Sequence, residues 1–382
     1  MKKKILMLGN HEIVIYNFRK ELVQKMIDEG YEVIISLPYG PKVEFLKQMG
    51  CSFIDTPINR RNTNPIEDIK LFLAYMKIVK AVKPDVVFTY TIKPNIYGGL
   101  ACRLKKIPYI VNVTGLGSSF INGGLLHHIV SNLSRLSFIK AKKVFFQNTA
   151  DRDLLISKKI VKDNYDLLPG SGVNLNQYLV LPYPSKEDPI VFNFIARVMK
   201  DKGIDEYLEA ATIIKQKYSN VVFNVIGMID QPVYEEILND YQEKGIIIYQ
   251  GFQTNLIPFI EQSSCTINPS YTEGMSNVLL ESAACGRPII ASNIPGCKEI
   301  VEEGINGYTF EVKNVPSLVE AIENFIHLEH KTKINMGLLG RKKVEQEFNR
   351  EIVVNKYILE IESVEKRKCR NWNIKKLLKV KS

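Results

Sequence analysis

The chain alternates between short apolar segments and stretches with helical periodicity, in two successive series. Six apolar segments form the first series, at residues 5–8, 32–37, 52–56, 86–90, 109–113 and 144–147. Five more form the second series, at residues 190–196, 221–226, 246–249, 265–268 and 288–291. The clearest helical patterns occupy residues 16–29, 43–49, 65–82, 204–218, 233–244, 256–262, 316–327 and 333–348. Parallel strands need crossover connections, which are usually helical, so this alternation predicts parallel sheets covered by helices on both faces.

The two series are separated by residues 181–189, LPYPSKEDP, a stretch rich in proline and polar side chains that we interpret as a linker. A chain of 382 residues also exceeds what one hydrophobic core normally serves. We therefore expect an α/β protein with two Rossmann-like domains that face each other across a cleft. The expected domains are residues 1–180 and 189–355, followed by a C-terminal segment, residues 356–382. Ligands of such sheets bind outside the carboxyl ends of the strands.

The composition narrows the class of protein. No apolar run is long enough to span a bilayer, and the apolar run after the basic start is too short for the core of a signal peptide. The six cysteines are scattered without a CxxC pair, which is typical of reduced thiols in a cytoplasmic protein. The net charge of +10 is compatible with nucleic acid, anionic lipid or phosphorylated substrates as partners, and it does not choose among them.

The stretch 269–295, PSYTEGMSNVLLESAACGRPIIASNIP, predicts a loop, a short helix and a buried strand. Ser276 or Asn277 can cap the helix, because a short polar side chain accepts a hydrogen bond from an otherwise unpaired backbone N–H group. Gly286 ends it. The start of such a helix is an anion site, where unpaired N–H groups and the positive end of the helix dipole coincide.

Two carboxylates flank this helix start. Glu273 lies in the loop, and Glu281 lies about 12 Å further along the axis at roughly 1.5 Å per residue, too far for the pair to share a proton or a metal. They are spaced to hold opposite ends of one elongated anionic ligand, with Glu281 accepting from ribose hydroxyls and Glu273 facing a sugar. The alternative is that both carboxylates merely favour the positive end of the helix.

The same residues carry a resemblance to a known family. Glu273 and Glu281, separated by GMSNVLL, resemble the paired-glutamate motif of the retaining glycosyltransferases of family 4, and the surrounding stretch resembles that family closely. The resemblance extends to about residue 360 and implies the GT-B fold, in which the last helix crosses back onto the first domain. It also implies attack on the same face as the departing group, with the leaving phosphate assisting proton transfer.

Two cations follow the first strand of the second series, in ARVMKDKG. Arg197 and Lys202 stand where a strand ends and a helix follows, and they match the family's diphosphate-binding Arg and Lys. Fixed cations there would stabilise the charge that develops on a leaving nucleotide diphosphate. The alternative for both is a solvated loop. We therefore expect Glu273, Arg197 and Lys202 to be the catalytic residues.

The remaining donor-side residues are expected around the same helix start. The resemblance places Gly227 near the base and diphosphate, although a plain turn after a strand explains that glycine equally well. Gly274 follows the first glutamate, and the backbone N–H groups of Ser276, Asn277 and Val278 are expected to face the phosphates.

The acceptor-side candidates lie in the first series, mostly at predicted strand ends. They are Asn10, His11, Arg19, Lys93, Thr114 and Gly115. The loop NVTGLGSSF, which also holds Gly117, is similar to the subgroup that builds bacterial surface polysaccharides and glycans. Many members carry a histidine near the donor sugar where this chain has Thr114, so the acceptor-side catalytic group is not assigned. His11 is the best-placed histidine, and its alternative is a loop histidine bonded to backbone.

We expect no metal and no cofactor. Asp151-Arg152-Asp153 matches the DxD signature of metal-dependent transferases of a different fold, but acidic residues at a helix start explain it without a metal. His327 and His330 have a metal-like spacing without an evident third ligand, and a solvated helix face explains them. The partial glycine motif at residues 115–118 lacks the rest of a dinucleotide fingerprint.

The last stretch, residues 366–381, reads KRKCRNWNIKKLLKVK. Its Lys and Arg residues alternate with Trp372, Ile374, Leu377 and Leu378, a pattern typical of segments that lie on anionic membrane surfaces. The alternative is a disordered basic tail. No nucleic-acid-binding module is recognisable, so nucleic acid is not an expected partner.

Together these features predict a metal-independent hexosyl- or N-acetylhexosaminyltransferase, peripheral on the cytoplasmic face of the cell membrane. It would move a sugar, with retention, from a nucleotide diphosphate donor such as UDP-hexose or UDP-HexNAc to a lipid-linked saccharide. The alternatives are a sugar-nucleotide epimerase of the same fold and a non-enzymatic protein that binds membrane surfaces.

Overall fold

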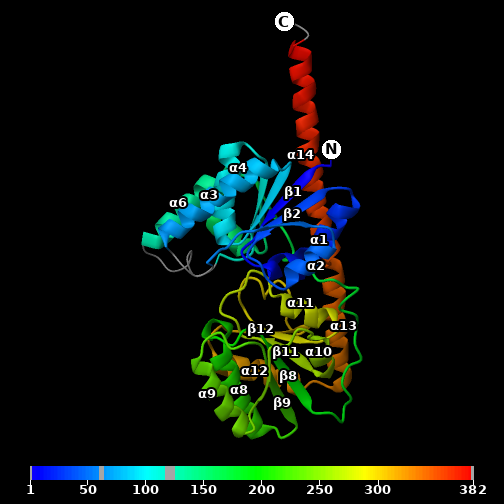
Figure 1. Cartoon of the computed structure of the whole chain (residues 1–382). Helices are drawn as coiled ribbons and strands as arrows, with labels where there is room; N and C mark the ends of the chain where they lie inside the picture. The colour runs from blue at the N-terminus through cyan, green and yellow to red at the C-terminus, as the bar shows by residue number, and fades with distance from the viewer. Residues whose placement is uncertain (1, 60–63, 117–124, 380–382) are drawn as a thin grey trace. The chain divides into compact units, whose positions relative to one another are not determined.

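The computed structural model describes residues 2–59, 64–116 and 125–379, and the side chains of residues 125–126 and 365–379 lie outside that description. The chain divides into two compact units (Figure 1). Unit 1 comprises Met1–Ser171 and Glu351–Ser382, and unit 2 comprises Gly172–Arg350.

Unit 1 is built on one parallel sheet with the strand order β3-β2-β1-β4-β5-β6-β7. Its strands are β1 (Lys4–Leu8), β2 (Glu32–Leu37), β3 (Ser52–Asp55), β4 (Val86–Tyr90), β5 (Tyr109–Val113), β6 (Lys143–Phe146) and β7 (Tyr165–Leu167). β1 is central, with Ile5 opposite Val33 of β2 and opposite Val86 of β4. Residues 5–8 are fully buried, because apolar side chains from helices cover both faces of the sheet.

The crossover helices of unit 1 are α1 (Glu12–Asp28), α2 (Lys42–Gln48), α3 (Pro65–Val82), the π-helical turn η1 (Pro94–Gly98), α4 (Gly99–Lys105), α6 (Leu125–Phe138) and α7 (Thr149–Ser157). Three of them, α1, α3 and α7, begin at a residue whose side chain caps the helix. Asn64 caps α3 by accepting from the backbone N–H of Ile66 at 2.9 Å, and Pro65 occupies the first helical position. α1 begins four residues earlier than its periodicity predicted, because His11 accepts from the N–H of Ile13 and caps the helix there.

The last helix, α14 (Arg350–Lys379), packs against the sheet of unit 1 (Figure 1). Val353, Tyr357, Ile361 and Val364 recur at helical spacing, and all four are buried with residues of β1 and β4. The expectation that the C-terminal helix crosses back onto the first domain is thereby confirmed.

Unit 2 has a second parallel sheet, with the strand order β10-β9-β8-β11-β12-β13. Its strands are β8 (Ile190–Ile195), β9 (Val221–Ile226), β10 (Ile248–Gly251), β11 (Cys265–Asn268), β12 (Ile289–Ser292) and β13 (Gly307–Phe310). Its helices are the 3-10 turn η2 (Lys200–Lys202), α8 (Ile204–Lys217), α9 (Val233–Glu243), α10 (Ile257–Gln262), α11 (Asn277–Ala284), α12 (Val315–Ile326) and α13 (His330–Glu347). The predicted α/β class with two Rossmann-like halves is confirmed by these sheets.

The division between the units falls at residues 171 and 172, ahead of the stretch 181–189 that the sequence suggested as a linker. Arg287 explains the position, because its fully buried guanidinium donates to the carbonyls of Leu181 and Pro182 and to that of Ile260 at 2.9 Å. Arg341 likewise donates to the Tyr178 carbonyl at 2.6 Å. The proline-rich stretch therefore belongs to unit 2, held by these hydrogen bonds, and does not form a linker between the units. At the C-terminal boundary of unit 2, the chain returns to unit 1 at Glu351, whereas the expected C-terminal segment began at residue 356.

Candidate functional site

The start of α11 is built by polar side chains that follow β11. Ser276 caps the helix, accepting from the Leu279 N–H at 3.4 Å, and its hydroxyl also accepts from the Asn268 amide at 2.7 Å. Asn268 in turn accepts from the Ser270 N–H at 3.1 Å, so the loop of residues 269–276 is fixed at both ends. The predicted cap at Ser276 is confirmed, and Gly286, with a φ of 77°, follows the last helical turn as predicted.

The backbone N–H groups at this helix start are not all available to a ligand. Ser276 donates its N–H to the Gly296 carbonyl at 2.9 Å, which corrects the expectation that this group faces a phosphate. The N–H groups of Asn277 and Val278 have no acceptor within the parts of the chain that the structure describes. Gly296, with a φ of 85°, has to be glycine, because a Cβ there would lie 2.7 Å from the Gly274 carbonyl oxygen.

Lys202 and Glu273 meet beside this helix start, although they are 71 residues apart in the chain. The Lys202 ammonium lies 2.6 Å from one carboxylate oxygen of Glu273, which also accepts from the Ser270 hydroxyl at 2.9 Å. Gly203 makes the approach possible, because a Cβ there would lie 2.1 Å from the Pro269 carbonyl oxygen. The side chains of Lys202 and Glu273 keep 19% and 17% of their surface exposed, so a ligand can reach both.

Arg197 follows β8 and is more exposed than Lys202. One of its terminal nitrogens lies 3.3 Å from a carboxylate oxygen of Asp230, and about half of its side chain is exposed. Asp230 was not expected from the sequence, since it comes after a different strand, β9. A Cβ on Gly227 would lie 1.8 Å from the Ala196 carbonyl oxygen. The close approach of the ends of β8 and β9 is therefore enough to require glycine at position 227. This agrees with the alternative that Gly227 only forms the turn after a strand.

Glu281 lies within α11 beside two groups that sequence reasoning did not find. Burial raises the pKa of its carboxyl to about 7, against the opposing effects of a hydrogen bond with the Tyr178 hydroxyl and of the nearby charge of Arg350. Tyr178 and Arg350 come from the two ends of unit 2, far from Glu281 in the chain. No local pattern points to either, because only tertiary packing brings them to α11.

On unit 1, the sequence-predicted candidates occupy different environments. The Nδ1 atom of His11 accepts from the Ile13 N–H at 3.3 Å and lies 2.8 Å from a carboxylate oxygen of Glu12, which fits the structural alternative for this histidine. Lys93 pairs with Asp68 at 2.9 Å. Asn10, Thr114 and Gly115 are partly exposed and follow the carboxyl ends of β1 and β5. Gly117 lies outside the described residues.

Arg19, one of the acceptor-side candidates, is buried. Only 3% of the residue is exposed, and its guanidinium carbon lies 5.5 Å from the ring centre of Tyr90 and 5.7 Å from that of Tyr357. It donates to the Phe18 carbonyl at 2.7 Å. Cation–π contact between β4 and α14 accounts for this arginine, and its guanidinium is enclosed by protein.

The loop that holds Lys93 has an irregular backbone. Thr91 has a φ of 72°, which is unusual for a β-branched residue, and η1 begins three residues later at Pro94. The buried Asn95 side chain accepts from the Thr89 hydroxyl at 2.8 Å and donates to the Asn112 carbonyl at 2.8 Å. Strained backbone and π-helical turns are enriched at functional sites. No pattern in the sequence indicated the strained Thr91 or the π-helical turn η1.

The DxD segment lies in the first turns of α7. Asp151 donates its N–H to the capping side chain of Asn148 at 2.8 Å, and Asp153 pairs with Arg152 at 2.7 Å. Within the described residues, no group of three or more His, Cys, Asp or Glu side chains is placed to hold a metal ion. Nor does that part of the chain contain a helix long and apolar enough to cross a membrane.

Both halves of the chain match families of known proteins. The family model "Glycosyl transferases group 1" matches residues 182–343, and "Glycosyl transferase 4-like" matches residues 4–148. The N,N'-diacetylbacillosaminyl-diphospho-undecaprenol alpha-1,3-N-acetylgalactosaminyltransferase of Campylobacter jejuni is 26% identical, over 90% of this chain and 94% of its own length. The Escherichia coli UDP-Gal:alpha-D-GlcNAc-diphosphoundecaprenol alpha-1,3-galactosyltransferase is 24% identical, over 77% of this chain and 80% of its own.

Solved structures share the fold. A glycosyltransferase from Rickettsia africae superposes with a TM-score of 0.78 at 19% identity, covering 96% of this chain and 99% of that one. Anabaena HepE in complex with UDP and glucose gives a TM-score of 0.76 at 16% identity, covering 94% and 99%. These likenesses confirm the expected GT-B fold.

Proposed function

Since this chain belongs to the glycosyltransferase family whose models match both of its halves, we propose that it is a retaining enzyme that uses a UDP-linked sugar. The acceptor is a lipid-linked saccharide in the synthesis of a bacterial surface polysaccharide or glycan. The relatives from C. jejuni and E. coli, which are named for acceptors linked to undecaprenyl diphosphate, support this acceptor class. The transferred group is a hexose or an N-acetylhexosamine.

The observation that carries the proposal is the pair formed by Lys202 and Glu273 at the start of α11. One ammonium has three N–H donors, so Lys202 can keep its contact with Glu273 while it donates to a phosphate oxygen. The N–H groups of Asn277 and Val278, which have no acceptor among the described residues, supply two more donors at the same helix start. A carboxylate suited to a sugar thus lies next to an ammonium and a helix start suited to phosphates. A sugar joined to a diphosphate requires this combination.

Each residue then has a separate task. Arg197 and Lys202 neutralise the diphosphate as the bond to the sugar breaks, which stabilises the leaving group. Glu273 binds the donor sugar, and Glu281 accepts hydrogen bonds from ribose. The acceptor hydroxyl attacks from the face that the diphosphate leaves, and the leaving phosphate takes its proton.

Incubation with a panel of UDP-sugars, with and without a lipid-linked saccharide, tests the proposed reaction. We expect sugar transfer that requires both substrates, measured by chromatography of the glycolipid product. Isomerisation of the donor without an acceptor would instead indicate an epimerase. Absence of both reactions across the panel would leave only surface binding.

We expect transfer to continue without a divalent metal. The charge of the diphosphate is met by Arg197, Lys202 and the start of α11, whereas Asp151 and Asp153 serve the start of α7. The measurement is the transfer rate after exhaustive treatment with EDTA. Loss of activity that returns on adding Mg²⁺ or Mn²⁺ would contradict this assignment.

We further propose that the enzyme lies on the cytoplasmic face of an anionic membrane and that residues 366–381 contribute to the contact. Deleting residues from Lys366 onward should lower binding to anionic vesicles, most clearly at low salt, because basic residues near such a surface are attracted electrostatically. Turnover of a short soluble acceptor should remain at the full-length rate. Vesicle sedimentation measures the first effect, and unchanged sedimentation of the shortened chain would rule out this role.

A further inference from the structure

Unit 1 contains a pocket of about 720 Å³ at the edge of its sheet opposite to the loops that carry Asn10, Lys93 and Thr114. The pocket lies where β5, β6 and β7 begin, whereas those loops follow strand ends. Its lining includes Lys140, Lys142, Lys143, Lys162, Asp163 and Val364. It is therefore separate from the sequence-predicted sites of unit 1.

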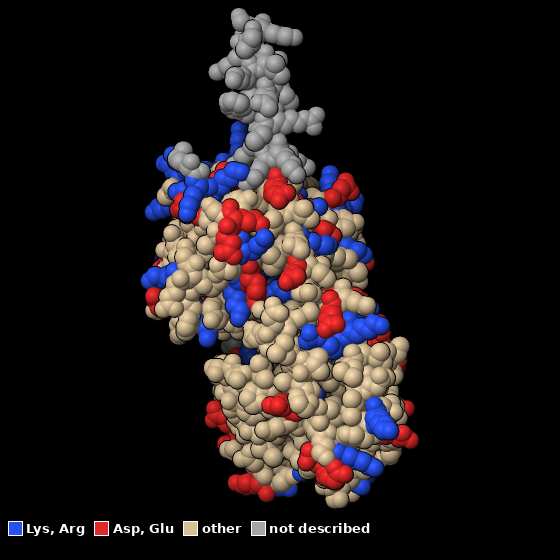
Figure 2. Space-filling view, turned by 90° about the vertical axis from the view of Figure 1, so that its right-hand side faces the viewer, with Lys and Arg blue, Asp and Glu red and all other residues tan. Residues whose placement is uncertain are grey.

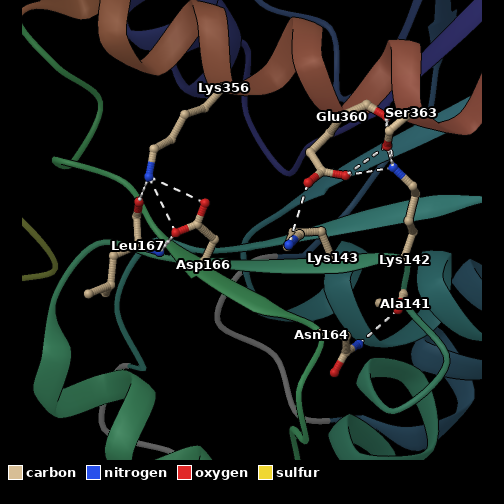
Figure 3. Close-up of polar contacts among 9 residues, drawn as sticks. All are labelled: Ala141, Lys142, Lys143, Asn164, Asp166, Leu167, Lys356, Glu360 and Ser363. Carbon is tan, nitrogen blue, oxygen red and sulfur yellow. Dashed lines mark hydrogen bonds and ion pairs between the residues drawn. The ribbon is translucent and has the colours of Figure 1, made fainter.

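Four of the lining residues are lysines, so we call this cavity the lysine pocket. Glu360 of α14 neutralises part of the charge of these lysines. The Lys142 ammonium lies 2.6 Å from a carboxylate oxygen of Glu360 and also contacts the Ser363 hydroxyl (Figure 3). Lys143 lies 3.5 Å from the other carboxylate oxygen (Figure 3). Burial alone would raise the pKa of Glu360, but the hydrogen bond from Lys142 and the charges of both lysines hold that pKa below its ordinary value.

Lys140 and Lys162 provide positive charge that no described side chain compensates. Both are exposed, and neither has an ion pair or a side-chain hydrogen bond within the described portions of the chain. Asp163 is the single acidic residue among the lining residues. The pocket thus keeps an excess of positive charge even after Glu360 has paired with Lys142 and Lys143.

The wall that carries these lysines is held by hydrogen bonds. The Asn164 amide donates to the Phe138 carbonyl at 2.9 Å and to the Ala141 carbonyl at 2.8 Å, which ties the loop before β7 to the loop before β6 (Figure 3 shows the second bond). The Val144 N–H donates to the Asn164 carbonyl at 2.7 Å. A fixed backbone lowers the entropic cost of gathering several ammonium groups around one anion.

We propose that the lysine pocket binds a phosphate ester, of the kind that the head group of an anionic phospholipid presents. Ammonium groups are suited to phosphate oxygens, and clustered lysines attract anionic head groups. The pocket also adjoins α14 at Val364, which is followed by Glu365 and then by the basic sequence 366–381. In Figure 2, Lys and Arg side chains lie at the upper end of unit 1, with Asp and Glu side chains beside them. A free phosphate ester has the same chemistry, so the experiment separates the two sources.

The test uses the full chain and the double variant Lys140→Gln/Lys162→Gln. Vesicles of phosphatidylglycerol in phosphatidylcholine supply the head group, and sn-glycerol 3-phosphate supplies the free ester. We expect the variant to partition onto the vesicles roughly tenfold more weakly, since each lysine near an anionic surface contributes appreciable attraction. The matched control is Lys77→Gln/Lys80→Gln, which removes two exposed lysines of α3 outside the pocket and should change partitioning less than twofold.

Calorimetry with sn-glycerol 3-phosphate then identifies the source. Binding by the wild type that the pocket variant loses would assign the pocket to free esters as well, whereas loss of vesicle binding alone would assign it to lipid head groups. Equal binding by pocket variant and wild type in both assays, or equal loss in pocket and control variants, would overturn the proposal. Because neither assay contains donor or acceptor, its outcome is independent of the proposed transfer reaction.

Discussion

Replacing Lys202 with alanine lowers the turnover of sugar transfer by roughly tenfold to over a hundredfold while the protein stays folded. The lysine would donate a charge-assisted hydrogen bond to the leaving diphosphate, and such bonds contribute about 1.5–3 kcal/mol. The substitution also leaves Glu273 without its 2.6 Å partner. We therefore expect the effects of Lys202→Ala and Glu273→Gln on turnover to be non-additive in a double-mutant cycle, as is usual for residues in contact.

Arg197→Ala should lower turnover by a similar factor, because Arg197 is assigned to the same diphosphate. Its effect on the melting temperature should be small, since its contact with Asp230 is 3.3 Å long and half of its side chain is exposed. Lys200 is the matched control, an exposed lysine of the 3-10 turn η2, which also holds Lys202, and it has no assigned role. Near-wild-type transfer rates in both Arg197→Ala and Lys202→Ala, measured at saturating substrate, would remove the basis for the diphosphate site.

Replacing Glu281 with glutamine weakens the binding of UDP itself. Glu281 lies about one turn into α11, where it can reach the ribose of a nucleotide whose phosphates meet the helix start. A carboxylate accepts hydrogen bonds from two ribose hydroxyls, whereas the amide of glutamine offers one acceptor oxygen. Titration calorimetry measures the affinity, with Glu236→Gln on the exposed face of α9 as the control.

The raised pKa of Glu281 gives the same residue a pH signature. With a pKa of about 7 the carboxyl is mostly protonated at pH 6, so wild-type affinity for UDP should rise by about tenfold between pH 6 and pH 8 through this group. The rise should be absent from Glu281→Gln, and comparing the two proteins cancels the titration of UDP. The native state also holds this proton above the ordinary carboxyl pKa of 4.5, so the group's stabilising contribution is present at low pH and is lost as the pH rises towards 7.

Glu273→Gln should do the reverse, sparing UDP affinity while lowering transfer. Glu273 precedes the helix start and contacts Lys202 and Ser270 rather than the region of α11 around Glu281. Its assigned partner is the sugar, which UDP lacks. Equal loss of UDP affinity in the two glutamate variants would refute the division of roles between them.

Much of the fold could be predicted from local sequence. The bounds of β2, β4, β5, β9, β11 and α3 agree with the predicted segments, because apolar runs and capping residues act within a few residues of one another. The strand β10 is shifted by two residues, and the edge strands β7 and β13 were not predicted. Their sequences, YDL in β7 and GYTF in β13, contain no run of apolar residues, so little of either strand's pattern stands out in the sequence.

The glutamates, the cations and the cap at Ser276 were also readable from the chain, through their order and through the family they resemble. Only the tertiary structure could decide which of them meet. The Lys202–Glu273 pair, the approach of Tyr178 and Arg350 to Glu281, the burial of Arg19 between Tyr90 and Tyr357, and the lysine pocket beside α14 each join segments remote in sequence. Local periodicity specifies which face of an element is apolar, whereas the partner of a polar side chain depends on how crossover connections place distant strand ends and helix starts side by side.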